Sequence, residues 1–182
     1  MTTETEALSA TEIPTGVWNI DPVHSVASFS IRHMMVGTFR GEFTEIEGSL
    51  ADGKLVGKVN VSSVKLKDEH LLGHVLSPDF FDAVRFPEIV FESSSLDLAG
   101  DVLTAEGTLT IKETALPVTA VGRLAGPVVT LGDVEKIGID LETTVDRTAI
   151  GLNWQAPLPQ GGFALGTAVT ITVSIELARA DD

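Results

Sequence analysis

Cysteine and tyrosine are both absent from this chain of 182 residues, and aromatic residues make up only 5% of it. Without thiols, the chain has no disulfides, no thiolate nucleophile and no cysteine-ligated zinc or iron–sulfur centre. No apolar run reaches the length of a transmembrane helix, so we expect no membrane insertion. The scarcity of aromatic residues also argues against an outer-membrane barrel, which needs aromatic girdles at both interfaces.

Basic residues are also scarce. Twelve Lys and Arg stand against 26 Asp and Glu, which gives a formal net charge of −14 and a pI near 4.5. A protein that binds phosphates along a nucleic acid needs clustered cations, so we expect no nucleic-acid partner. Anionic membrane surfaces are disfavoured for the same reason.

The first residues lack the basic start and apolar stretch of a secretory signal. We therefore predict a disordered acidic leader over residues 1–13 and a cytoplasmic protein. Neither an internal repeat nor a Pro/Ser-rich linker interrupts the remainder, which predicts one domain over residues 14–180. A chain of this length can bury a substantial core without a metal or a disulfide.

Apolar and polar residues alternate along most of the chain. Near the C-terminus, Val169, Ile171 and Val173 alternate with Thr170 and Thr172. Such alternation is typical of antiparallel strands with one apolar face and one solvated face. The predicted class is therefore all-β, and the lengths of the runs favour a barrel. Further strands are predicted at residues 17–20, 38–50, 56–63, 89–98 and 116–130.

One segment, at about residues 69–83, departs from this alternation. Leu71, Leu72, Val75 and Leu76 recur at helical spacing. Ser77 followed by Pro78 then has the pattern of a second helix start. We predict one or two short helices here, which cover an edge or an end of the sheet.

Two clusters in the sequence have residue types that are used in catalysis or metal binding. His70 and His74 share one face of the predicted helix and are spaced to hold a metal ion, although the spacing also arises by chance. Asp21, His24 and Ser25 offer an acid, a base and a hydroxyl, but local neighbours rarely converge as a catalytic triad. A hydrolase or a metal-dependent enzyme acting on a lipophilic substrate is therefore the alternative interpretation.

Seven sequence blocks together resemble the YceI-like family. They occur in family order, and the set is more specific than any single block. They are WNIDPVHS at residues 18–25, FSIRHM at 29–34, VGTFRGEF at 36–43, HVLSPDFFDA at 74–83, FPEIVFES at 86–93, GTLTIK at 107–112 and DRTAIG at 146–151.

The resemblance implies an extended lipocalin-like barrel of about eight antiparallel strands. It also implies a long apolar ligand of the polyisoprenoid or fatty acid and amide type, and a homodimer. It implies neither a catalytic residue nor a cofactor or metal.

We therefore expect a non-enzymatic carrier that holds a polyisoprenoid, an isoprenoid quinone or a fatty acid or amide inside the barrel. The strand alternation selects the inward-facing side chains, and His33 shares the face of Phe29 and Ile31. The predicted ligand-binding residues are Phe29, Ile31, His33, Phe39, Phe43, Val59, Val61, Leu109, Ile111, Leu141, Val145, Val169, Ile171, Val173 and Ile175.

Overall fold

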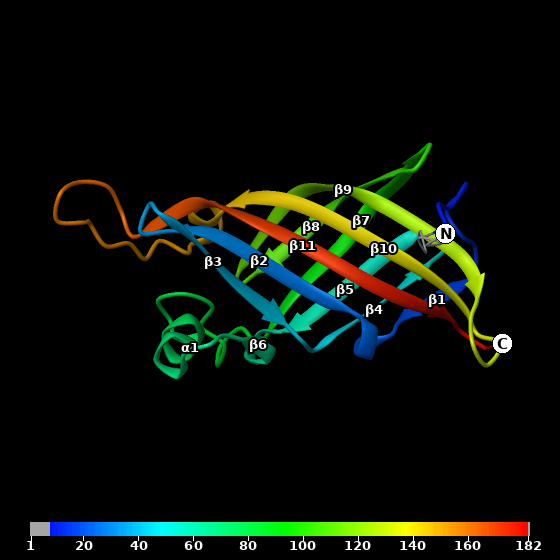
Figure 1. Cartoon of the computed structure of the whole chain (residues 1–182), viewed down its shortest axis with the longest axis horizontal. Helices are drawn as coiled ribbons and strands as arrows, with labels where there is room; N and C mark the ends of the chain where they lie inside the picture. The colour runs from blue at the N-terminus through cyan, green and yellow to red at the C-terminus, as the bar shows by residue number, and fades with distance from the viewer. Residues whose placement is uncertain (1–7, 182) are drawn as a thin grey trace, which may run out of the picture.

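The computed structural model describes residues 8–181 and has the predicted all-β, antiparallel architecture (Figure 1). Eight strands form a closed ring in which each is hydrogen-bonded to its neighbours, and β11 returns to β1. In ring order they are β1 (Val17–Ile20), β4 (Ile46–Ala51), β5 (Lys54–Asn60), β7 (Glu88–Ala99), β8 (Val102–Ile111), β9 (Thr114–Val129), β10 (Glu135–Asp146) and β11 (Leu165–Arg179).

Three further strands extend the sheet from β11: β2 (Val26–His33), β3 (Gly37–Phe43) and β6 (Val64–Lys65). The long strand β11 makes this branching possible, because its two halves have different partners. Its C-terminal residues pair with β1, with Ile20 opposite Leu177, whereas its earlier residues pair with β2, with Phe29 opposite Ile171. The backbone ring therefore closes at the β1 end, and β2 and β3 form the wall beside the other half.

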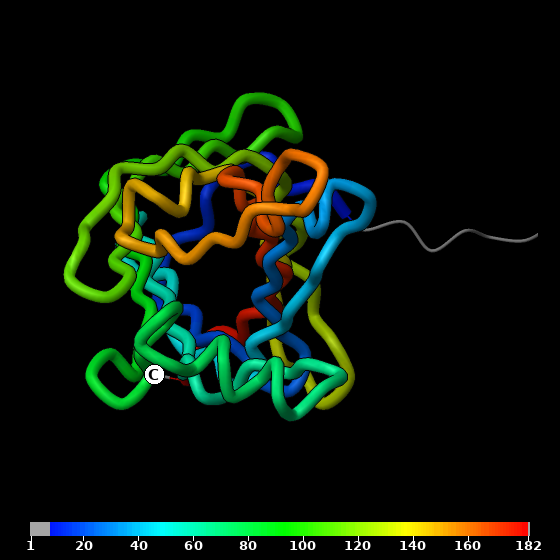
Figure 2. Tube along the Cα trace, turned by 90° about the vertical axis from the view of Figure 1, so that its left-hand side faces the viewer, coloured from blue at the N-terminus to red at the C-terminus, as the bar shows by residue number. Residues whose placement is uncertain are grey.

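The two ends of the barrel differ in their packing. At the end with β1, large side chains pack in the interior, and they include Trp18, Leu50, Leu103, Ile139 and Leu177, each at most 1% exposed. At the opposite end lie helix α1 (Glu69–Leu76) and the long connection between β10 and β11 (Figure 1). Viewed from that end, the backbone runs as a ring around the barrel axis (Figure 2). We call these the closed end and the α1 end.

The predicted helical region contains one α-helix and a series of turns. Asp68 is the N-cap of α1, where its carboxylate accepts a hydrogen bond from the Leu71 N–H. Ser77 ends α1 and begins a turn in which its carbonyl accepts from the N–H groups of Phe80 and Asp82. Asp82 has a φ of 50°, which lies outside the right-handed helical region and prevents a second helix here.

Two predicted strands have different limits in the structure. The run 38–50 is divided into β3 and β4 because the chain turns at Thr44 and Glu45, whose N–H groups donate to Ser63 Oγ. The run 56–63 ends as a strand at Asn60, whose side chain caps a 3-10 helix, η2 (Val61–Ser63). Two further 3-10 helices are η1 (Pro22–His24) and η3 (Arg147–Ile150).

Part of the predicted leader is ordered against the barrel. Ala10 is buried and donates to the carbonyl of Leu124, while the carbonyl of Leu8 accepts from Gly126. The β8–β9 ladder reaches only Gly122, so the following residues of β9 have free backbone groups that this segment pairs. Residues 8–10 therefore pair with the free edge of β9 in the structure, residues 1–7 lie outside the described range, and the disordered leader stays a prediction. No helix within residues 8–181 is long and apolar enough to cross a membrane.

Candidate functional site

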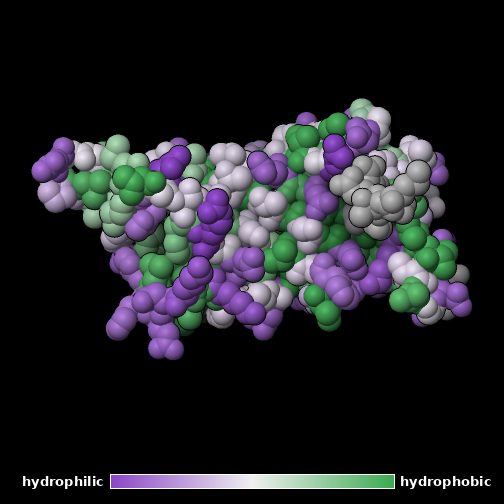
Figure 3. All heavy atoms as spheres, in the orientation of Figure 1, coloured by the Kyte–Doolittle hydropathy of each residue, from purple (hydrophilic) through white to green (hydrophobic). Residues whose placement is uncertain are grey.

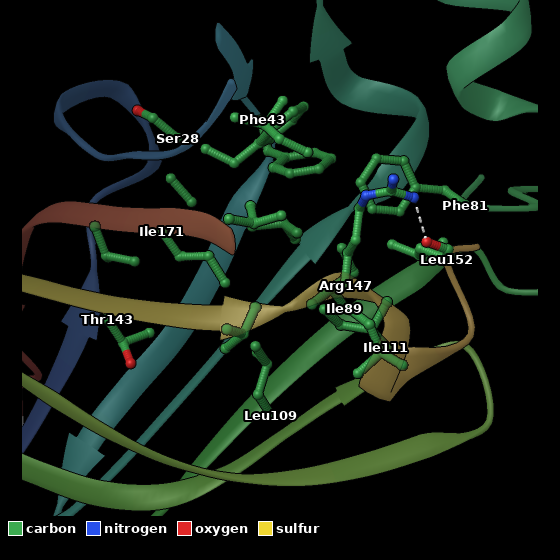
Figure 4. Close-up of a pocket in the computed structure, with 18 of the residues that line it drawn as sticks. Ser28, Phe43, Phe81, Ile89, Leu109, Ile111, Thr143, Arg147, Leu152 and Ile171 are labelled. Carbon is green, nitrogen blue, oxygen red and sulfur yellow. Dashed lines mark hydrogen bonds between the residues drawn. The ribbon is translucent and has the colours of Figure 1, made fainter. Parts of the chain in front are cut away.

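The interior of the α1 half contains a cavity of about 390 Å³ whose walls are almost entirely apolar. Strands from both sides of the barrel contribute to it (Figure 4). Fourteen of the predicted ligand-binding residues line this cavity: Phe29, Ile31, His33, Phe39, Phe43, Val59, Leu109, Ile111, Leu141, Val145, Val169, Ile171, Val173 and Ile175. The structure thus brings them together around one space, and their contact with a ligand stays a prediction.

Val61 is the exception among the predicted residues. It lies in η2, after β5 has ended, where the alternation of a strand no longer determines which way a side chain points. Its side chain is 1% exposed and belongs to the packed core, and it is not part of the cavity wall. Its N–H donates to the carbonyl of Pro87. The prediction that Val61 faces the cavity is therefore wrong.

His33 lines the cavity, but it does not lie in an apolar interior as the alternation of β2 suggested. It is exposed, because β2 ends at this residue and the chain turns at Met34 and Met35. Met34 and Leu71 also line the cavity and are 40% and 37% exposed. The cavity therefore opens to solvent at the α1 end.

Apolar side chains are also exposed around this opening. Met35, Val36 and Phe163 are between 58% and 87% exposed, on the β2–β3 turn and the β10–β11 connection. Green atoms cover much of the projecting loop in Figure 3, next to purple hydrophilic residues. Exposed apolar side chains therefore border the entrance.

Aromatic rings form the wall between the strands and the turns after α1. The Phe29 ring lies 6.0 Å from Phe39, 5.7 Å from Phe43 and 6.1 Å from Phe81, measured between ring centroids. Tilted and edge-to-face contacts at these distances are favourable. Near the entrance, the His74 ring meets Trp154 edge-on with the centroids 5.1 Å apart.

Several wall residues were not predicted because they come from α1, the turns and the β10–β11 connection. Leu71, His74, Phe80, Phe81 and Trp154 belong to this group. The turns and the connection have no regular apolar spacing, and the helical spacing of α1 does not by itself show which of its side chains meet the barrel interior.

Arg147 is the most unusual member of the wall, because it is a cation that is only 3% exposed. Its Nε donates to the carbonyl of Gly166 at 2.7 Å, and its Nη1 donates to the carbonyls of Leu152 and Trp154 at 2.6 and 2.8 Å (Figure 4). The guanidinium thereby fastens the β10–β11 connection to the barrel. Burial lowers the pKa of Arg147, and the neighbouring Asp146 opposes that change.

Asp21, His24 and Ser25 lie at the closed end, outside the cavity wall. Asp21 Oδ2 is 2.9 Å from His24 Nδ1 and 2.9 Å from Lys136 Nζ, and these two contacts hold the pKa of Asp21 far below its usual range. Ser25 Oγ instead exchanges hydrogen bonds with the backbone of Glu176. The acid, base and hydroxyl are therefore not aligned as a hydrolytic triad.

This cluster also has the donor types of a metal site. Asp21, His24 and Glu176 are the one group of potential ligands that converges within residues 8–181. Lys136 Nζ, however, lies 2.9 Å from Asp21 Oδ2 and 3.1 Å from Glu176 Oε2. The ammonium group already pairs with both carboxylates, so the arrangement is that of an ion-pair network.

The predicted histidine pair on α1 does not converge with a third ligand. His74 Nε2 is 3.1 Å from Asp79 Oδ2, and Asp68 caps the helix. His70 is exposed. The metal-site alternative therefore lacks a complete set of ligands around these histidines in the described part of the chain.

Comparison with known proteins agrees with this fold. The family model for the YceI-like domain matches residues 18–177. The chain belongs to the YceI-like family. A UPF0312 protein of Staphylococcus aureus (strain N315) is 30% identical over 171 residues, a match that covers 88% of this chain and 96% of the relative.

Two solved structures have the same architecture. BcnA of Burkholderia cenocepacia superposes with a TM-score of 0.69 at 20% identity, covering 86% of this chain and 98% of BcnA. A polyisoprenoid-binding domain from Saccharophagus degradans superposes with a TM-score of 0.65 at 11% identity, covering 90% of this chain and 98% of that one. These likenesses concern the fold, and the homodimer implied by the family resemblance stays a prediction.

Proposed function

We propose that this protein is a non-enzymatic carrier that holds the hydrocarbon tail of a long-chain lipid in the cavity. The polyisoprenoid, isoprenoid quinone and fatty acid or amide classes all provide such a tail. The observation that carries the proposal is the apolar cavity of about 390 Å³, which is open at the α1 end. Pockets of this volume and composition are typical of sites for small apolar ligands. The solved domain from Saccharophagus degradans, described as polyisoprenoid-binding, supports the same ligand type.

Burial of the tail supplies enough free energy for this function. Transfer of about ten methylene groups from water is worth roughly 8 kcal/mol, at about 0.8 kcal/mol for each group. That is the scale of a micromolar complex before the costs of association are subtracted. No cofactor is required for such binding.

Native mass spectrometry of protein purified from its own host tests the proposal, with extraction of any bound lipid. We expect a mass excess that corresponds to one lipid and disappears after extraction. The delipidated protein should then bind a long-chain probe, hexadecanoate or 1-hexadecanol, at one site. Absence of a bound lipid together with no binding of either probe would overturn the proposal.

A second measurement separates the carrier from a hydrolase. Incubation with a long-chain acyl ester should leave the ester intact, because Ser25 Oγ is bonded to backbone groups and not to His24. Hydrolysis that is lost in Ser25→Ala would instead show an enzyme.

A further inference from the structure

Arg147 has no carboxylate partner, although it is almost completely buried. Within residues 8–181, its guanidinium forms hydrogen bonds only to three backbone carbonyls and makes no salt bridge. Its sequence neighbour Asp146 is exposed and points elsewhere, because its carboxylate caps η3 through the N–H and hydroxyl of Thr148. A buried cation that no carboxylate contacts is costly unless a ligand places a counter-charge beside it.

The Nη2 atom of Arg147 remains available to donate a hydrogen bond to a ligand. The three hydrogen bonds use Nε and Nη1, and Nη2 has no partner among the described residues. Every fully buried side-chain nitrogen or oxygen in that part of the chain is hydrogen-bonded, so Nη2 must retain some accessible surface. Because Arg147 is only 3% exposed and lines the cavity, that surface faces the cavity.

The position of Arg147 also gives a direction to the ligand. It follows β10 at the α1 end, beside Leu152 and Trp154 of the connection that borders the entrance. The opposite part of the cavity is bounded by apolar residues such as Ile20, Ile46 and Ile175, which adjoin the packed core. A polar head therefore meets the buried guanidinium of Arg147 at the first position, whereas the second is bounded by apolar side chains of the packed core.

We propose that Arg147 selects lipids with an anionic head group, a carboxylate or a phosphate, by donating from Nη2 to an oxygen of that head while the tail extends toward the closed end. This inference rests on the proposed carrier function and narrows it to single-chain acidic amphiphiles. Charge-assisted hydrogen bonds of this kind are stronger than neutral ones. Lipids with a neutral head group and the same chain length bind less tightly, because they place no counter-charge beside the buried guanidinium.

The test compares hexadecanoate, hexadecyl phosphate and 1-hexadecanol as probes of the delipidated protein and of two variants. Arg147→Met removes the buried cation, and Arg40→Met removes an exposed arginine on β3, so both change the net charge equally. We expect the wild type and Arg40→Met to prefer the anionic probes over the alcohol by about 10- to 100-fold. Arg147→Met should lose this preference and retain the alcohol affinity, and the better of the two anions identifies the head group.

A measurement on the wild type keeps the proposal testable if Arg147→Met does not fold. Carboxyl-labelled ¹³C hexadecanoate, titrated in the complex by NMR, should have a pKa below that of the free acid, because Arg147 stabilises the carboxylate. A raised pKa, or equal binding of acid and alcohol, would overturn the role of Arg147 while leaving the carrier function intact. If no probe binds the wild type, the carrier function itself fails.

Discussion

Ile171 and Thr172 are adjacent on β11 and face opposite sides of the barrel wall. Ile171 lines the cavity beside Phe29, its partner on the neighbouring strand β2, whereas Thr172 is exposed. A large side chain at Ile171 therefore occupies the space proposed for the ligand, and the same side chain one residue later projects into solvent.

We predict that Ile171→Trp weakens binding of a fluorescent long-chain fatty acid by about tenfold or more, because the indole displaces part of the tail. Thr172→Trp is the matched control and should bind like the wild type. Equilibrium titration gives both affinities, and circular dichroism confirms the fold. Equal losses in the two variants would contradict the assignment of the inward face.

The packed closed end and the hollow α1 half should respond differently to the same truncation. Ile139 is 1% exposed in the closed-end core, whereas Ile171 borders empty space. We expect Ile139→Ala to lower the free energy of unfolding by about 3 kcal/mol and Ile171→Ala by only about 1 kcal/mol, because fewer packing contacts are lost beside a cavity. Urea denaturation of delipidated protein measures both. A larger loss for Ile171→Ala would show that the α1 half is tightly packed.

The ion-pair network at the closed end should make stability depend on pH. The pKa of Asp21 is lowered in the folded protein by His24 and then by Lys136. The contribution of ionised Asp21 to the free energy of unfolding is therefore complete above the unfolded pKa of about 3.9. It decreases as the pH falls below that value. We expect Asp21→Asn to cost about 1 kcal/mol at neutral pH, with the difference from wild type shrinking in acid.

The control for this prediction is Asp97→Asn on β7, because Asp97 is exposed and has no salt bridge among the described residues. Denaturation curves at several acidic pH values give the pH profile of each protein. A constant difference between wild type and Asp21→Asn, down to the lowest pH, would mean that the network does not stabilise the fold.

The two tryptophans occupy different places and should report ligand position. Trp154 lines the cavity, and its carbonyl accepts from Arg147. Trp18 is 1% exposed in the closed-end core, and its Nε1 donates to the carbonyl of Thr15. We expect 2-bromohexadecanoate, whose bromine adjoins the head, to quench the emission of Trp154 and not that of Trp18.

Two single-tryptophan variants separate the fluorescence of Trp154 from that of Trp18 in the quenching experiment. Trp18→Phe should retain the quenching, and Trp154→Phe should abolish it. Quenching that persists without Trp154 would place the head group at the closed end, opposite to the orientation proposed here.

Much of the barrel could be predicted from the sequence because strand alternation is a local signal. Val169, Ile171 and Val173 point inward in the structure as their period requires. The ring closure by β1 could not be predicted in this way, since it depends on a pairing between Ile20 and Leu177 that are far apart in the chain. Likewise, the ordered Leu8–Ala10 segment depends on free backbone groups of β9.

Arg147 is a cavity-lining residue that the strand alternation could have identified. Leu141, Thr143, Val145 and Arg147 follow one another at intervals of two residues, and all four line the cavity. The alternation of β10 thus extends to Arg147, but a charged residue at a strand end usually faces solvent. Val61 shows the opposite error, because an apolar residue was assigned an inward direction after its strand had ended.

Anomalous diffraction from crystals grown with 16-bromohexadecanoic acid, which carries bromine at the tail end, shows whether the cavity holds the lipid tail. We predict one bromine peak per chain inside the cavity, near Ile20, Leu141 and Ile175. A bromine found only at the surface, with the cavity free of ligand density, would show that the cavity is not the binding site of the tail.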